Sequence, residues 1–132
     1  MLLKILLNHS KKALELNVDA IELDVYACES GELVVIHDNK IDRTTNGKGY
    51  VTEKTLDELR ILDAGDGEKI PLSSEVFDII NKKVKINIEL KGNKVAKHVN
   101  DLIQDYIKNK GWKYKHFIIS SFNIMNLSDS MN

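Results

Sequence analysis

Two acidic residues and a histidine on neighbouring predicted strands are the residues of this sequence best suited to chemistry. Glu22 and Asp24 alternate with apolar residues in Ile21-Glu22-Leu23-Asp24-Val25, and His37 follows the apolar run Val34-Val35-Ile36. Successive side chains of a strand point to opposite faces, so Glu22 and Asp24 share one face, with Cα atoms roughly 6.5 to 7 Å apart. The pattern therefore predicts an imidazole beside a pair of carboxylates, the groups expected of a hydrolase.

A third carboxylate, Glu89, has the same kind of position in a later predicted strand. In Ile86-Asn87-Ile88-Glu89-Leu90-Lys91 the apolar residues take one face and leave Glu89 and Lys91 on the other. If the apolar faces of both strands pack on helices, Glu22, Asp24 and Glu89 meet in the interior of a barrel or at its mouth. Carboxylates this close repel one another unless a cation lies among them, and oxygen ligands suit Ca²⁺ or Mg²⁺ better than zinc. The alternative is an antiparallel sheet whose solvated face carries these carboxylates as ordinary surface residues.

His37 stands where a predicted strand gives way to a loop, and its position allows two interpretations. In a parallel barrel the carboxyl ends of the strands form the catalytic face, where an imidazole can transfer protons near neutral pH. Alternatively, the ring is a hydrogen-bonded loop histidine that pairs with Asp38 or Asp42. Arg43 is predicted to hold one of these two aspartates and so to fix the loop.

Apolar periodicity and turn residues predict alternating helices and strands. Helices are expected at about 3–16, 55–62, 73–81, 94–110 and from 123 onward, and strands at 18–25, 33–36, 84–90 and 117–121. Thr55 and Glu58 form a predicted capping box at the start of the second helix. Ser73 or Ser74 is the expected cap of the third helix, and Gly111 is the expected end of the longest. Strands separated by helices favour parallel βα units in one domain, as a doubly wound sheet or a barrel.

The composition is that of an ordinary globular domain. The 132 residues are 42% hydrophobic and 30% charged, with a formal net charge of -1. Basic and acidic residues are interspersed, so we expect no positive field of the kind that binds nucleic acid. The apolar start, Met1 to Leu7, is interrupted by Asn8 to Lys12 and is too short for a signal peptide or a membrane span. A cytoplasmic location is the default expectation.

Several blocks of the sequence resemble, in order and in spacing over about 11–126, the glycerophosphodiester phosphodiesterase family. The blocks are Ala13-Leu14-Glu15-Leu16, Asp19-Ala20-Ile21-Glu22-Leu23-Asp24-Val25, Gly31 through Val35, Ile36-His37-Asp38, Asp42-Arg43-Thr44-Thr45-Asn46-Gly47-Lys48-Gly49, Lys69-Ile70-Pro71, Ile86-Asn87-Ile88-Glu89-Leu90-Lys91 and Ile119-Ser120-Ser121-Phe122. A lone Glu-x-Asp would be a weak match, whereas this ordered set is specific. The resemblance implies an α/β fold, a partial (βα)8 TIM barrel of the phospholipase C-like phosphodiesterase type with about four of its eight strands.

The resemblance also implies an activity and residue roles. Family members hydrolyse glycerophosphodiesters, small-molecule substrates, to glycerol 3-phosphate and an alcohol, using a divalent cation and a pair of histidines. Three roles are matched by position: metal ligands, the second catalytic histidine, which protonates the leaving oxygen, and a phosphate-contacting lysine. Glu22, Asp24 and Glu89 match the metal ligands, and the metal would be Ca²⁺ or Mg²⁺. His37 matches the second catalytic histidine, and Lys91 matches the phosphate-contacting lysine.

Two motifs with which the family opens are absent from this sequence. They are a strand bearing His-Arg-Gly and a helix start bearing Pro-Glu-Asn-Thr. Counting back from Ala13, the glutamate of the second motif falls at about Lys4, and His9 lies too late to replace the missing histidine. A complete barrel typically needs ~250 residues, so residues 1–132 are expected to form a partial glycerophosphodiester phosphodiesterase domain truncated at both ends.

This expected truncation has consequences for activity and association. Weak or absent activity is expected of the chain alone, with self-association through exposed barrel edges. The alternative is a non-catalytic remnant or interaction module that binds a divalent cation or a complementary barrel fragment.

Overall fold

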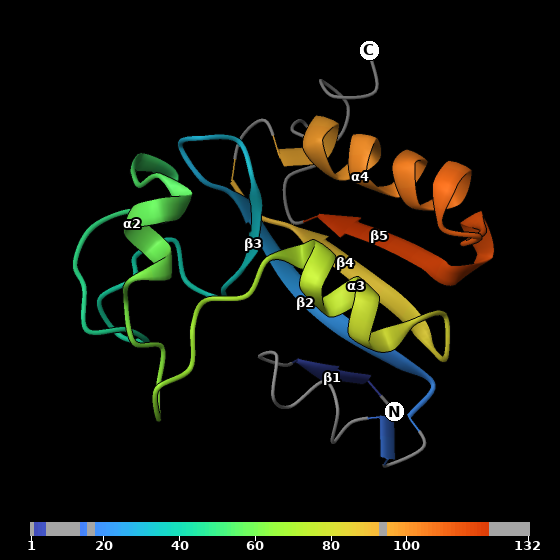
Figure 1. Ribbon diagram of the computed structural model, residues 1–132, viewed down its shortest axis with the longest axis horizontal. Helices are drawn as coiled ribbons and strands as arrows, with labels where there is room; N and C mark the ends of the chain where they lie inside the picture. The colour runs from blue at the N-terminus through green and yellow to red at the C-terminus, as the bar shows by residue number, and fades with distance from the viewer. Residues whose placement is uncertain (1, 5–13, 16–17, 93–94, 122–132) are drawn as a thin grey trace.

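The structure, a computed structural model, describes residues 2–4, 14–15, 18–92 and 95–121. Its elements are, in order, β1 (Leu2–Lys4), β2 (Ala20–Ala27), β3 (Leu33–Val35), the 3₁₀ helix η1 (Val51–Glu53), α2 (Leu56–Arg60), α3 (Ser73–Ile80), β4 (Lys85–Leu90), α4 (Val95–Asn109), the 3₁₀ helix η2 (Tyr114–His116) and β5 (Phe117–Ser121). Figure 1 shows α3 and α4 over one face of a sheet, with α2 and its loops set to the side beyond β3. Within the described ranges, no helix has the length and apolarity needed to cross a membrane.

Four strands of the sheet are parallel and follow the order β1-β2-β4-β5. The crossovers from β2 to β4 and from β4 to β5 run through α3 and α4, which is the βα repeat of a barrel. The predicted α/β fold is confirmed. In contrast, β3 is antiparallel to β2, with Val35 opposite Val25, so counting it among the parallel barrel strands is wrong. The physical reason is the short turn between β2 and β3, because a parallel partner requires a crossover of a dozen or more residues.

The strand β1 corrects a second prediction. The apolar pattern predicts a helix from about residue 3, but Leu2–Lys4 forms a strand parallel to β2, with Lys4 in register with Glu22. Periodicity alone does not separate a short apolar run of strand from one of helix, and pairing with a neighbouring strand decides between them. Leu14 and Glu15 are helical. The remainder of the predicted first helix and the helix predicted from residue 123 lie outside the described residues.

The main core lies between the sheet and helices α3 and α4. Strand alternation in β2 and β4 directs every second side chain toward the helices. Apolar residues at helical spacing in α3 and α4 form the faces that pack against these side chains. The fully buried members are Ile21, Leu23, Val25, Val76, Phe77, Ile80, Ile86, Ile88 and Val95. At one end Phe77 packs against Tyr106, Trp112 and Phe117, with ring centroids 5.1, 5.7 and 5.5 Å away. This packing leaves the other face of the sheet to the polar residues of the same strands.

A second, smaller core supports the segment between β3 and α3. Its buried members are Tyr26, Cys28, Val34, Ile36, Ile41, Val51, Leu59 and Ile70. The predicted capping box of Thr55 and Glu58 starts α2 and is confirmed. The predicted end of the longest helix is confirmed as well, since Gly111 follows α4 with φ +77° and Trp112 N–H donates back to the carbonyl of Tyr106 over 3.2 Å.

Helix α3 is capped by Glu75 and not by Ser73 or Ser74. Its N-cap position is Leu72, whose backbone N–H donates to the Glu75 carboxylate over 2.8 Å. An apolar N-cap residue leaves the first N–H groups of a helix without an acceptor, and a carboxylate three residues on supplies one. The same carboxylate accepts two hydrogen bonds from the Arg60 guanidinium, which ties α2 to the start of α3. These bonds hold the pKa of Glu75 below its usual range.

Glu75→Gln is expected to lower the free energy of unfolding by about 1 kcal/mol at neutral pH, since the pair is partly exposed and partly screened. A carboxyl group with a lowered folded-state pKa stabilises the fold above its unfolded value, and this contribution is lost as pH falls through the folded pKa. The difference between wild type and variant should therefore be smaller at acidic pH than at neutral pH. Urea unfolding at both pH values measures it, with Glu29→Gln on an exposed glutamate as control. An equal difference at both pH values would contradict this origin.

Candidate active site

Three carboxylates converge on the face of the sheet that α3 and α4 do not cover. The register of β2 and β4 sets Asp24 directly opposite Glu89, with Glu22 two residues earlier and opposite Asn87. Glu22, Asp24 and Glu89 each offer one oxygen atom, and these three atoms lie within 4.8 Å of one another. The structure therefore brings together the three residues predicted as metal ligands, which we call the carboxylate cluster.

The chemistry of the carboxylate cluster fits a hard divalent cation. Asp24 and Glu89 are only 5% and 7% exposed, and burying neighbouring carboxylates is unfavourable unless positive charge accompanies them. Lys91, the predicted phosphate-contacting residue, supplies one such charge, with Nζ 3.8 Å from Glu89 Oε2. A donor set made only of oxygen is the set that hard divalent cations prefer. The cluster can thus hold a divalent metal ion.

His37 approaches the carboxylate cluster from the loop after β3. Its Nε2 lies 4.0 Å from Asp24 Oδ2. The backbone N–H of Ile36 donates to the carbonyl of Asp24 over 3.1 Å, which fixes the start of this loop beside β2. Of the two interpretations of His37, one places it at the carboxyl end of a parallel strand and the other in a loop, paired with Asp38 or Asp42. The ring reaches the cluster because the antiparallel β3 carries the chain back along β2.

Asp38 and Arg43 hold the other side of the His37 ring. His37 Nδ1 lies 2.8 Å from Asp38 Oδ1, and Arg43 donates from Nε to Asp38 Oδ2 over 2.7 Å and from Nη2 to Oδ1 over 3.1 Å. The hydrogen bonds from Arg43, followed by the one from His37, hold the pKa of Asp38 well below its usual range. Of the two aspartates that Arg43 could hold, it binds Asp38. Asp42 instead accepts a hydrogen bond from the backbone N–H of Gly49 over 2.9 Å.

Tyr26 is a site residue that the sequence analysis did not single out. It lies two residues beyond Asp24 on the same face of β2 and is 6% exposed. A Cβ atom on Gly92, where φ is +77°, would lie 3.4 Å from the Tyr26 ring, so the backbone passes close to it. Burial, and then the charges of Asp24 and Asp38, raise the pKa of Tyr26, which keeps its hydroxyl a hydrogen-bond donor. Extending the strand alternation by one step was the signal that could have found it.

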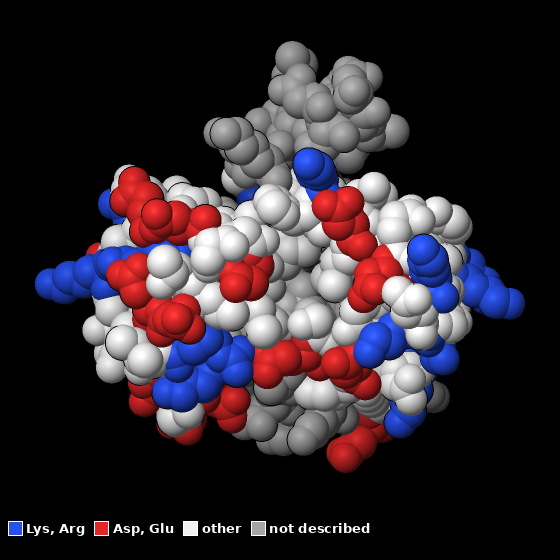
Figure 2. Space-filling view, turned by 45° about the horizontal axis from the view of Figure 1, so that its top comes forward, with Lys and Arg blue, Asp and Glu red and all other residues white. Residues whose placement is uncertain are grey.

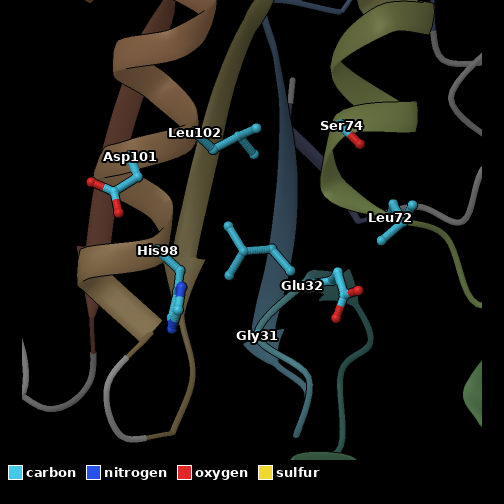
Figure 3. Close-up of a pocket in the computed structure, with 8 residues that line it drawn as sticks. Gly31, Glu32, Leu72, Ser74, His98, Asp101 and Leu102 are labelled. Carbon is cyan, nitrogen blue, oxygen red and sulfur yellow. The ribbon is translucent and has the colours of Figure 1, made fainter. Parts of the chain in front are cut away.

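A cavity of about 380 Å³ lies on the opposite side of the sheet, between α3, α4 and β3. Glu32, Leu72 and Ser74 line one wall and His98 and Leu102 the other, whereas the carboxylate of Asp101 points away from the space (Figure 3). The cavity therefore lacks the convergence of charged groups that distinguishes the carboxylate cluster.

The surface charge is mixed. On the molecular face shown in Figure 2, acidic and basic side chains are interspersed, and neither sign forms a continuous field.

Comparison with known proteins gives a consistent result. Residues 7–130 match the model of the glycerophosphoryl diester phosphodiesterase family. A glycerophosphodiester phosphodiesterase of Caldanaerobacter subterraneus is 44% identical over 128 residues, which cover 90% of this chain and 52% of that protein. The chain thus spans about half the length of this curated relative.

Solved structures agree in fold. A glycerophosphodiester phosphodiesterase from Agrobacterium tumefaciens superposes with a TM-score of 0.82 at 28% identity, covering 98% of this chain and 62% of that one. A phosphodiesterase from Oleispira antarctica, solved with the product sn-glycerol-3-phosphate, gives a TM-score of 0.77 at 27% identity over 94% of this chain and 53% of that one. The predicted relation to TIM-barrel phosphodiesterases is therefore confirmed. On the match of the family model to nearly all of its length, this chain belongs to the glycerophosphoryl diester phosphodiesterase family.

Proposed function

We propose that the carboxylate cluster and its neighbours bind glycerophosphodiesters and serve their hydrolysis to glycerol 3-phosphate and an alcohol, with Ca²⁺ or Mg²⁺ as cofactor. The observation that carries this proposal is the convergence, from separate elements, of three carboxylates within 4.8 Å, a histidine and a lysine. Such a set can hold a cation, a phosphate group and a transferable proton at one place. The relatives' names and the Oleispira product complex support the same substrate class.

Each residue has a separate task in this proposal. Glu22, Asp24 and Glu89 hold the cation, which when bound neutralises charge on the phosphoryl oxygens. Lys91 places a further positive charge where the phosphate binds. His37 gives a proton from Nε2 to the leaving alcohol oxygen as the P–O bond breaks. The oxygen of a water molecule forms the new bond to phosphorus and releases one of its two protons to solvent. Nε2 of His37 takes up a proton from solvent before the next turnover.

The sequence of β1, the strand beside β2, bears on the rate of this reaction. The family's opening strand carries a histidine and an arginine, whereas β1 reads Leu2-Leu3-Lys4 and has neither. We therefore expect slow or undetectable turnover by this chain, with cation and phosphate binding retained. This strand also favours the second candidate function, a non-catalytic module that binds a divalent cation. Self-association through the sheet edges and a cytoplasmic location stay predictions.

Calorimetric titration with sn-glycerol 3-phosphate, in the presence of Ca²⁺ or Mg²⁺, tests the proposal. Binding should be abolished by EDTA. Lys91→Met should weaken it by about tenfold or more, because a hydrogen-bonded charge is lost, while cation binding is nearly unchanged. Lys113→Met, on an exposed lysine, is the matched control. Binding that neither EDTA nor Lys91→Met affects would overturn the proposal.

An assay for release of glycerol 3-phosphate from glycerophosphocholine tests the expected rate separately. Turnover should be absent or slow. Rapid, EDTA-sensitive turnover that is lost in His37→Ala would contradict the low rate and would exclude the non-catalytic candidate.

A further inference from the structure

We propose that Asp38 and Arg43 are positioning residues, which fix His37 in the tautomer that keeps its proton on Nδ1 and leaves Nε2 to exchange protons at the carboxylate cluster. The mechanistic meaning of this inference rests on the proposed function. The hydrogen-bond chain itself does not, because it is a property of the folded protein. It consists of Arg43, Asp38 and His37 in sequence, which we call the Arg43–Asp38–His37 chain.

Distances decide which carboxylate orients the ring. Asp38 Oδ1 lies 2.8 Å from Nδ1, within hydrogen-bonding distance, whereas Asp24 Oδ2 lies 4.0 Å from Nε2, beyond it. An ionised carboxylate can only accept hydrogen bonds, so the bond to Asp38 requires the proton on Nδ1. The neutral ring then has an unprotonated Nε2 on the side of the carboxylate cluster. Any proton that His37 gives to a substrate leaves from Nε2 and returns there.

Arg43 fixes the orientation of Asp38 and thereby favours the Nδ1–H tautomer of His37. It contacts both oxygens of Asp38, through Nε at 2.7 Å and Nη2 at 3.1 Å, and a two-pronged contact of this kind fixes the plane of a carboxylate. Its hydrogen bonds are also the largest cause of the lowered pKa of Asp38, which keeps this carboxyl group ionised. Both oxygens of Asp38 therefore have partners: Oδ1 contacts His37 and Arg43, and Oδ2 contacts Arg43. The His37 side chain is 54% exposed, so packing alone does not hold it.

The loop that carries Arg43 is itself anchored. Ile41 is 1% exposed in the second core and pairs with Gly49, its N–H donating to the Gly49 carbonyl over 2.9 Å. Thr45 donates from both its backbone N–H and its hydroxyl to the Ile41 carbonyl, over 3.0 and 2.7 Å. Arg43 lies between Ile41 and Thr45, so the backbone that carries its side chain is held in place near Asp38. The orientation of His37 is thereby tied to a folded loop.

Histidine ring tautomers can be read from ¹⁵N–¹H correlation spectra, recorded at alkaline pH, of protein labelled on its histidines. We expect His37 to show the Nδ1–H tautomer in roughly tenfold excess, as a hydrogen bond to a charged group implies. In Asp38→Asn the amide can donate to Nδ1, so the Nε2–H form should gain the majority. Arg43→Gln should reduce the excess several-fold, since Asp38 is then free to turn. Lys48→Gln, on an exposed lysine of the same loop, should leave it unchanged.

The protein contains its own reference for this measurement. His116 Nδ1 accepts a hydrogen bond from the backbone N–H of Lys113 over 2.9 Å, so this ring should show the Nε2–H form in every folded variant. If Asp38→Asn fails to fold, the His116 signature is lost, and Arg43→Gln, on a side chain that is 68% exposed, becomes the deciding variant.

Three results would overturn the proposal: a wild-type His37 in the Nε2–H form, equal tautomer ratios in wild type and Asp38→Asn, or no change in Arg43→Gln. None of them depends on turnover. Absence of cation or phosphate binding would contradict the proposed function and leave this measurement intact.

Discussion

Asp24→Asn is expected to weaken divalent-cation binding by at least about 10- to 100-fold, the loss typical even for an outer partner of a metal ligand. Asp24 is the central member of the carboxylate cluster, since it lies directly opposite Glu89 and two residues from Glu22. The substitution keeps the shape of the side chain but removes one negative charge, and affinity for a hard cation depends on the charge of its ligands. Calorimetric titration with Ca²⁺ or Mg²⁺ measures the loss.

The same substitution is expected to have the opposite effect on the metal-free protein. With no cation bound, removing one of three neighbouring carboxylates relieves repulsion inside a poorly solvated site. The free energy of unfolding in EDTA should therefore rise in Asp24→Asn. It should fall below that of wild type when the cation is in excess, because binding stabilises the folded state. Asp57→Asn, on an exposed aspartate, should change neither quantity. Equal cation affinity in wild type and Asp24→Asn would contradict the assigned ligand role.

Phe77→Ala is expected to lower the free energy of unfolding by about 3–5 kcal/mol, the range for removing a fully buried aromatic side chain. Phe77 is 0% exposed and contacts three aromatic rings, one each from α4, the loop after it and β5. Its loss leaves a cavity at the place where α3, α4 and the sheet meet. Domains of this size have a total stability of about 5–15 kcal/mol, so the loss is at least about a fifth of the total and, at the low end of this range, most of it.

Urea unfolding followed by Trp112 fluorescence measures this effect, because Trp112 lies beside the substituted ring at a centroid distance of 5.7 Å. Tyr114→Ala, on an aromatic side chain that is 65% exposed, should cost less than about 1 kcal/mol. Similar losses in the two variants would show that burial at Phe77 is not what stabilises the core.

The carboxylate cluster follows from the sequence because strand alternation is a strict geometric rule. Side chains two residues apart share a face, so the apolar partners of Glu22, Asp24 and Glu89 determine where these carboxylates point. The start of α2 and the end of α4 also follow from the sequence, because a capping box and a terminal glycine are signals that lie within a few residues. These signals are local, so contacts with the rest of the chain did not change them.

The parts that could not be predicted depend on which residues pair with each other, and the pattern of residue types does not give that pairing. The direction of β3 is set by the short turn before it, and the strand character of Leu2–Lys4 is set by its pairing with β2. The choice of Arg43 between Asp38 and Asp42 depends on how the whole loop closes, through Gly49 and Ile41. Leu72 as the N-cap of α3 was missed because the capping group, Glu75, comes from inside the helix.

The residues of the candidate site are supported by two different hydrophobic cores. The carboxylates lie on strands of the main core, whereas the loop with His37 and Asp38 belongs to the smaller core around Ile41 and Leu59. Segments with few buried apolar contacts open locally at lower free energy than core strands do. Hydrogen exchange should therefore find the backbone of Ile41 less protected than that of Leu23. A cation at the carboxylate cluster would then stay bound while the loop with the proposed proton donor, His37, opens. Metal affinity and proton transfer would in that case be adjustable separately in one fold.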